Sequence, residues 1–333
     1  MIQKNVLVIT TIMPPTKSIS QFSKFREIRI VVVGDKKTPS SWEHPKARFL
    51  SIEEQGQMGY EISKSLPYNH YARKMIGYLY AIKTNAQTII DTDDDNIPKD
   101  NWQIPENGKY ETEYLTTPPD LGFINIYRNY TKYHIWPRGF PLGRIMRKDA
   151  VINKKELLRK KTRVGIWQGL ADGDPDVDAI YRLTINAPCY FKDKEPVVLD
   201  KGTLCPINSQ NTIFPIKALF PLLYLPAFVS FRFTDILRGL VAQPIMWAAG
   251  YLLGFTTSTV IQERNPHDYM NDFELEIPCY LLTEKIIDIV SNAVRESLSV
   301  SDNLYESYIA LQKADIVTKE ELDLLSKWLK DIV

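Results

Sequence analysis

The sequence predicts an α/β protein in which a parallel or mixed sheet is covered by helices. Its first hundred residues alternate short β-branched runs with helical stretches, and the two clearest runs are NVLVITTI at residues 5–12 and IRIVVVGD at residues 28–35. Each run ends in residues suited to a ligand-facing loop. Because open α/β sheets bind ligands at the carboxyl ends of their strands, these loops are candidate binding elements.

A helix and an acidic loop are expected next along the chain. Residues 71–85, YARKMIGYLYAIKTN, carry apolar residues on one side at helical spacing, with Arg73 and Lys74 in the first turns. The segment AQTIIDTDDDNIP that follows is expected to be a strand ending in an acidic loop.

The remainder of the chain is expected to be irregular and then mainly helical. Residues 101–157 are rich in Pro, Tyr and Trp, which suggests irregular structure closing over a site. The last segment, TKEELDLLSKWLKDIV, predicts an amphipathic helix capped by Thr318. Without a repeat or a low-complexity linker, we expect one compact unit with an α/β core at 1–212 and a C-terminal helical part at 213–333.

Composition narrows the class of function. The 41 basic and 40 acidic residues leave a net charge of +1, which offers no electrostatic footprint for nucleic-acid binding and fits small-molecule or glycan partners better. The three cysteines are odd in number and lack metal-ligand spacing, so neither a disulfide framework nor a zinc site is indicated. The N-terminal apolar run is too short for a signal peptide, and we expect a cytoplasmic protein.

Residues 239–262 contain no charged residue and are long enough to cross a bilayer. Gln243, Pro244, Gly250 and Gly254 weaken that interpretation. We therefore expect a buried helix followed by a strand, with a membrane-associated hairpin as the alternative.

The acidic loop holds four aspartates within five residues, Asp91, Asp93, Asp94 and Asp95. Carboxylates at a strand end can hold a hard divalent cation, which neutralises a diphosphate leaving group efficiently. The aspartate-any-aspartate pattern alone is weak, because most acidic loops are solvated turns. The position of the acidic loop after an apolar strand favours a site for Mn²⁺ or Mg²⁺. In this site Asp93 and Asp95 would bind the metal, and Asp93 and Asp94 would contact the substrate that carries the diphosphate, the donor.

Several ordered motifs between about Asn5 and Leu282 carry a family resemblance: NHYARKMIGYLYAI, DTDDDN, WPRGFPL, GLADGDPDVDAIYRLT, NSQNT, DILRG and RNPHDY. Together they resemble the STELLO-type glycosyltransferase domain, a relative of the reversibly glycosylated polypeptides. The resemblance implies a GT-A type fold, in which the aspartate motif holds the metal and the donor diphosphate. Residues 1–212 would then be the nucleotide-sugar-binding core, and 213–333 would include the acceptor side.

Donor-binding candidates follow the first two strands and begin the helix. Thr10, Thr11 and Asp35 stand where a GT-A protein commonly holds the uracil or ribose, although Asp35 is equally readable as a turn residue. Arg73 and Lys74 could meet the diphosphate, since a guanidinium forks onto phosphate oxygens. The alternative for this pair is solvated helix charge.

The segment GLADGDPDVDAIYRL resembles a calcium loop only superficially, because it lacks the twelve-position spacing and the terminal Glu. The family resemblance implies that this segment lies over the donor sugar. Asp176 and Asp178 are the candidates for binding sugar hydroxyls, and a capped helix start is the structural alternative.

Acceptor-side chemistry is assigned to Asp235 and Arg238, which lie one helical turn apart between apolar stretches. Burial there could tune the pKa of the Asp235 carboxylate so that it acts as the base that an inverting enzyme needs. The plainer explanation is an ion pair between Asp235 and Arg238 within one helix. His267 is a candidate third metal ligand, with Asp268 as a substitute and a surface histidine as the alternative.

The predicted function is metal-dependent transfer of a hexosyl or pentosyl group from a nucleotide-diphosphate sugar, with a UDP-sugar expected, to a glycan or other hydroxyl acceptor. A UDP-sugar mutase and a nucleotidyltransferase are alternatives, since the acidic loop suits all three. A non-catalytic scaffold that retains the fold is a further alternative.

Overall fold

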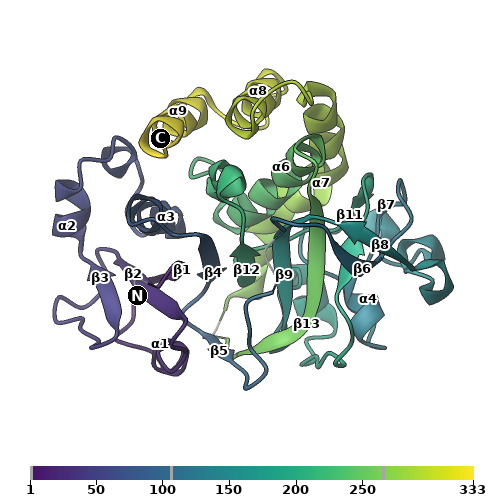
Figure 1. Ribbon diagram of the computed structural model, residues 1–333, viewed down its shortest axis with the longest axis horizontal. Helices are drawn as coiled ribbons and strands as arrows, with labels where there is room; N and C mark the ends of the chain where they lie inside the picture. Colours follow the sequence, from purple (N-terminus) through teal and green to yellow (C-terminus); the bar gives the residue numbers. More distant parts are fainter. Residues whose placement is uncertain (1–2, 106–107, 265–266) are drawn as a thin grey trace.

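The computed structural model describes residues 3–105, 108–264 and 267–333 and is built around one large mixed sheet (Figure 1). Within these residues the sheet has eleven strands: ten follow the order β3-β2-β1-β4-β12-β9-β13-β10-β6-β8, and β5 pairs with β13. The predicted α/β class is therefore confirmed. The strands are β1 (Asn5–Thr11), β2 (Ile28–Gly34), β3 (Ala47–Leu50), β4 (Thr88–Thr92), β5 (Asn96–Pro98), β6 (Thr112–Thr116), β8 (Leu158–Thr162), β9 (Val164–Gly173), β10 (Val197–Leu199), β12 (Asn211–Phe214) and β13 (Leu252–Gln262).

The N-terminal strands β3, β2, β1 and β4 run parallel to one another. Val6 and Val8 of β1 belong to one apolar core, whereas the alternate residues Leu7 and Ile9 belong to a second core. Side chains alternate between the two faces of a strand, so β1 is covered on both sides and reads as a continuous apolar run. The two strands predicted from β-branched runs are confirmed.

Helix α3 (Lys74–Lys83) covers β1 and β2, and a short 3₁₀ turn at Tyr71–Arg73 precedes it. The helix expected over 71–85 is therefore confirmed. Gly77 permits the close approach, because a Cβ there would lie 2.5 Å from Val8 Cγ1 and 2.7 Å from Val33 Cγ2. This packing fixes the start of α3 at the ligand-facing edge of the sheet.

The second half of the sheet brings the chain back to the acidic loop. β12 is antiparallel to both of its neighbours, β4 and β9, and the long strand β9 runs parallel to β13 on its other side. β5, which directly follows the acidic loop, pairs with the end of β13, and the Glu263 amide donates to the Asp95 carbonyl at 3.1 Å. The two expected parts, 1–212 and 213–333, thus share one sheet, since β12 contains the division.

Helix α6 (Thr234–Ala248) followed by β13 occupies the uncharged segment 239–262, which confirms the expected buried helix and strand. No helix among the described residues is long and apolar enough to cross a membrane.

Three further helices complete the C-terminal part: α7 (Tyr269–Ala293), α8 (Val300–Lys313) and α9 (Lys319–Asp331). Thr318 caps α9 as predicted, by accepting a hydrogen bond from the Glu321 amide. Figure 1 shows these helices on one side of the sheet, with α9 returning towards the N-terminal half. There the Asp331 carboxylate accepts the amides of Glu61 and Ile62, both at 2.9 Å.

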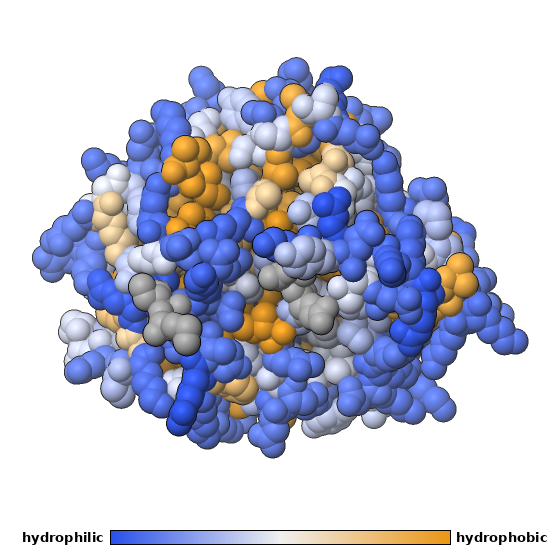
Figure 2. Space-filling model, viewed as in Figure 1, coloured by the Kyte–Doolittle hydropathy of each residue, from blue (hydrophilic) through white to orange (hydrophobic). Residues whose placement is uncertain are grey.

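The remaining elements are short. They are α1 (Lys17–Phe22), α2 (Ile52–Gln57), α4 (Tyr127–Tyr130), α5 (Ala179–Thr184) and the two-stranded sheet of β7 (Gly122–Phe123) and β11 (Thr203–Leu204). Residues 101–157 contain short strands and short helical turns among loops, close to the irregular structure expected. Hydrophilic residues cover most of the face shown in Figure 2, with apolar patches between them.

Candidate active site

Two adjoining cavities open at the carboxyl ends of β1, β2 and β4. The larger has a volume of about 390 Å³ and the smaller about 210 Å³. They share the residues Thr10, Ile12, Tyr71, Asp94 and Phe231, so the two cavities lie directly beside one another.

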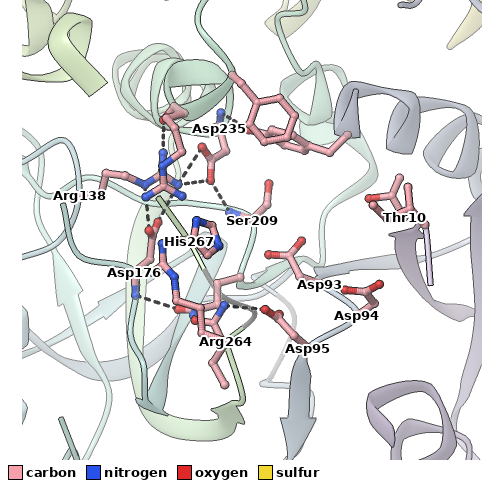
Figure 3. Close-up of a pocket in the computed structure, with 16 residues that line it drawn as sticks. Thr10, Asp93, Asp94, Asp95, Arg138, Asp176, Ser209, Asp235, Arg264 and His267 are labelled. Atoms are coloured by element: carbon pink, nitrogen blue, oxygen red, sulfur yellow. Dashed lines mark hydrogen bonds and ion pairs between the residues drawn. The ribbon is translucent and has the colours of Figure 1, made fainter. Parts of the chain in front are cut away.

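The acidic loop forms one wall of the larger cavity, where Asp93, Asp94 and Asp95 all line the space (Figure 3). Each carboxylate is held by another element. Lys74 Nζ lies 3.0 Å from Asp93 Oδ1, the Thr11 hydroxyl donates to Asp94, and Gln262 Nε2 donates to Asp95 Oδ2 at 3.0 Å.

Burial raises the pKa of the carboxyl groups in this loop. Burial together with the negative charges of Asp95 and Asp91 raises the pKa of Asp93 to about 7, against the opposing effect of Lys74. Burial also raises the pKa of Asp94 and of Asp95. Burial is thus the larger cause at all three positions, and repulsion between carboxylates contributes at Asp93 and Asp95.

A buried ion cluster fixes the base of this loop. Asp91, at the end of β4, accepts Lys74 Nζ at 2.9 Å and Arg238 Nη1 at 2.8 Å, and all three side chains are almost fully buried. The neighbouring carboxylates raise the pKa of Lys74 against its burial. This cluster joins α3, β4 and α6 beneath the cavity.

Arg138 organises the opposite wall. Its Nε lies 2.8 Å from Asp176 Oδ1, and its Nη2 lies 2.8 Å from Asp235 Oδ2. Asp235 also accepts the Ser209 amide at 3.2 Å. Burial raises the pKa of Asp235, but the nearby guanidinium of Arg138 outweighs it and holds that pKa below its ordinary value.

The loop carboxylates fit a divalent cation in part. Within the described residues, no group of three His, Cys, Asp or Glu side chains forms a ready-made cage. Asp95 Oδ1 is nevertheless buried without a hydrogen-bond partner among the described residues. Mg²⁺ commonly binds through one or two carboxylates plus substrate phosphates and waters, a mode that Asp93 and Asp95 suit.

His267 lines the larger cavity, but its Nδ1 lies 3.0 Å from Asp272 Oδ2. The structure therefore does not assemble Asp93, Asp95 and His267 into one three-ligand set. The substitute ligand Asp268 instead caps α7 by accepting the amides of Met270 and Asn271.

Some expected donor residues do line the smaller cavity: Thr10, Thr11, Asp35 and Arg73. The Arg73 guanidinium is already engaged, since it donates to Gln55 Oε1 and to the Leu66 carbonyl. Arg73 thus supports the cavity wall with most of its donors used.

Three expected site residues, Lys74, Asp178 and Arg238, are absent from the described residues that line either cavity. Lys74 and Arg238 serve Asp91 below the site, and Arg238 does not pair with Asp235. Asp178 caps α5 through the Tyr181 amide and accepts Trp136 Nε1 at 2.6 Å, which is the structural alternative for this residue. Arg238 and Asp178 are thus satisfied by buried partners, whereas Lys74 also pairs with the cavity residue Asp93.

Several residues that line the cavity were not among the candidate site residues chosen from the sequence, most of which were carboxylates. They are Tyr71, Arg138, Ser209, Gln210, Phe231, Arg232, Gln262 and Arg264. Arg138, Ser209 and Arg264 lie in the motifs WPRGFPL, NSQNT and RNPHDY, so motif membership was the available signal. Spacing alone could not identify them, because their partners are distant in sequence.

Comparison with known proteins supports a glycosyltransferase relationship. A family model described as STELLO glycosyltransferases matches residues 232–333. Over 98% of its length the chain is 27% identical to "Probable glycosyltransferase STELLO1" and also to "Probable glycosyltransferase STELLO2", both from Arabidopsis thaliana. The chain spans 44% of the length of each relative. The resemblance to STELLO glycosyltransferases expected from the motifs is confirmed.

Proposed function

We propose that this chain is a metal-dependent glycosyltransferase of the GT-A type, which transfers a sugar from a UDP-sugar to a glycan or other hydroxyl acceptor. The observation that carries the proposal is the larger cavity, in which three loop carboxylates lie opposite Asp176 and Asp235, both of which pair with Arg138. The similarity to the STELLO glycosyltransferases supports the same class of reaction.

The two cavities suggest how a donor would lie. The nucleoside occupies the smaller cavity beside Thr10 and Asp35, and the diphosphate extends past Asp94 into the larger cavity. Asp93 and Asp95 would hold Mn²⁺ or Mg²⁺, which neutralises charge on the diphosphate when bound. The sugar then reaches the wall formed by Asp176 and Asp235.

The acceptor step is assigned to Asp235. The acceptor oxygen forms a bond to the anomeric carbon, the bond from that carbon to the diphosphate oxygen breaks with its electron pair, and the acceptor proton passes to the carboxylate. Because Arg138 lowers the Asp235 pKa, the carboxylate is ionised and ready at neutral pH, although it is a weak base. Asp176, on the same arginine, is placed to accept hydrogen bonds from sugar hydroxyls.

Calorimetry of UDP binding tests the metal requirement. We expect measurable affinity in Mn²⁺ and strong loss of affinity in EDTA, because the clustered carboxylates of the loop repel a diphosphate at short range. Equal UDP affinity in both buffers would remove the metal from the proposal.

A further inference from the structure

Arg264 projects into the larger cavity from the segment that follows β13. In the view of Figure 3 its side chain lies between Asp176 and Asp95 and close to His267. The side chain is only 7% exposed, so it is set into the wall rather than extended into solvent. Neither the proposed metal site nor the proposed base uses it.

The guanidinium of Arg264 has donors to spare. Its contact with Asp272 is long, 3.4 Å from Nη2 to Oδ2, and Asp272 also accepts His267 at 3.0 Å. Its Nε is buried and has no hydrogen-bond partner among the described residues. A guanidinium carries five N–H donors, and the long contact with Asp272 is the one hydrogen bond that this guanidinium makes among the described residues.

The two other arginines of this cavity are committed to protein carboxylates. Arg138 binds Asp176 and Asp235 at 2.8 Å each, and Arg232 Nη2 lies 2.6 Å from Glu276 Oε1. Arg264 is therefore the cavity arginine with the weakest compensation among the described residues.

Electrostatics agree with this geometry. Burial lowers the pKa of Arg264, and the positive charges of Arg232 and Arg182 lower it further, against the smaller opposing effect of Asp174 and Asp176. A buried cation with a long ion pair and like-charged neighbours costs free energy that an anionic ligand would relieve.

We propose that Arg264 binds the β-phosphate of the donor diphosphate. This is the phosphate farther from the nucleoside, which is terminal in free UDP. The assignment rests on the proposed function and on the order of the cavities. The nucleoside end lies by Asp35 in the smaller cavity, whereas Arg264 lines only the larger one. A planar guanidinium can donate two parallel hydrogen bonds to phosphate oxygens, and Asp93 and Asp95 line the same cavity as Arg264.

Calorimetry in Mn²⁺ with UDP, UMP and uridine tests this assignment. We expect Arg264→Gln to weaken UDP binding by roughly 10- to 100-fold, the loss typical of a charge-assisted hydrogen bond. Binding of UMP and of uridine should stay unchanged, since neither carries the terminal phosphate. Arg264→Lys keeps the positive charge but cannot donate two parallel hydrogen bonds. Its UDP affinity should therefore lie between those of the unmodified protein and Arg264→Gln.

Arg159→Gln is the matched control, because Arg159 pairs with Glu195 on an exposed surface and should leave UDP affinity unchanged. Melting temperature without ligand provides a second readout. We expect Arg264→Gln to melt no lower than the unmodified protein, since burial and the repulsion from Arg232 and Arg182 outweigh the attraction of Asp174 and Asp176.

The outcomes separate this assignment from the proposed function. If the unmodified protein fails to bind UDP in Mn²⁺, the proposed function fails and the assignment with it. Two results would overturn the terminal-phosphate assignment while the proposed function stands. In the first, Arg264→Gln binds UDP as tightly as the unmodified protein does. In the second, the substitution weakens the affinity for UMP as much as the affinity for UDP. A lower melting temperature with unchanged UDP affinity would make Arg264 a structural partner of Asp272.

Discussion

The carboxylates in this site differ in pKa because they have different charged partners. Asp93 shares Lys74 with Asp91 and has a raised pKa, whereas Arg138 holds the Asp235 pKa low. Asp93 and Asp235, which line the same cavity, thus have opposite protonation tendencies.

Substitution of Asp235 separates catalysis from binding. We expect Asp235→Asn to lower transfer by roughly 10²- to 10⁴-fold, because the amide cannot take the acceptor proton. UDP affinity should persist, since Asp235 does not line the smaller cavity or belong to the acidic loop. Transfer rate, UDP affinity and melting temperature are measured on the same variant.

Near-normal transfer per folded molecule of Asp235→Asn would reject the base assignment. Asp235 would then serve only to hold Arg138, and the substitution would mainly lower the melting temperature, because a buried charge would lose a partner.

Sequence reasoning located the acidic loop and Asp235 because strand ends and charged residues in apolar runs are visible locally. It could not assign Lys74 and Arg238 to Asp91, whose partners lie 17 and 147 positions away along the chain. Nor could it find Arg138, which meets Asp235 across 97 positions. Ion pairing between distant elements depends on tertiary structure, which periodicity does not encode.

At the scale of elements, the Asp91 cluster joins α3 and α6 to the end of β4. We expect Asp91→Asn to lower the free energy of unfolding by about 3–5 kcal/mol, because it leaves the buried Arg238 without a carboxylate. Urea denaturation measures this loss. Asp149→Asn, which removes one partner of an exposed pair with Arg147, is the control and should leave stability unchanged. A similar small effect at both positions would show that the cluster does not anchor the loop.

Helix α9 docks through the buried Glu321. Its carboxylate accepts the Tyr224 hydroxyl and the amides of Ala227 and Phe228. Burial raises the pKa of Glu321 from 4.5 to about 7, against the lowering effect of these hydrogen bonds. The folded protein therefore binds this proton more tightly than the unfolded chain, and the resulting stabilisation, on the order of 3 kcal/mol, is lost as pH rises from about 4.5 through 7.

We expect Glu321→Gln to remove this part of the pH dependence, so its stability should fall less between pH 5 and pH 8 than that of the unmodified protein. Thermal or urea unfolding at the two pH values measures the difference. The exposed neighbour provides the control, Glu320→Gln. An unchanged pH dependence in Glu321→Gln would contradict the buried, protonated carboxyl.

At the scale of the whole molecule, one mixed sheet positions the acidic loop and part of the opposite wall of the larger cavity, while α6 supplies Asp235. The parallel strands β1 and β4 position the acidic loop, and β9, β12 and β13 bring the Asp176, Ser209 and Gln262 segments to face it. The α/β class and the elements with strong local patterns were predictable, including β1, β2, α3 and α9. The strand order was not, because it depends on pairings between segments more than a hundred residues apart.

The products formed from a UDP-sugar and a hydroxyl acceptor in Mn²⁺ test the proposed glycosyl transfer most directly. A panel of UDP-sugars is incubated with candidate glycan acceptors, and Asp95→Asn provides the control because it alters a proposed metal ligand. We predict free UDP together with a new glycoside, and loss of both with the variant. An isomerised UDP-sugar without UDP release would indicate a mutase. Pyrophosphate formed when UTP and a sugar phosphate are supplied instead would indicate a nucleotidyltransferase. Either result without a glycoside would contradict glycosyl transfer.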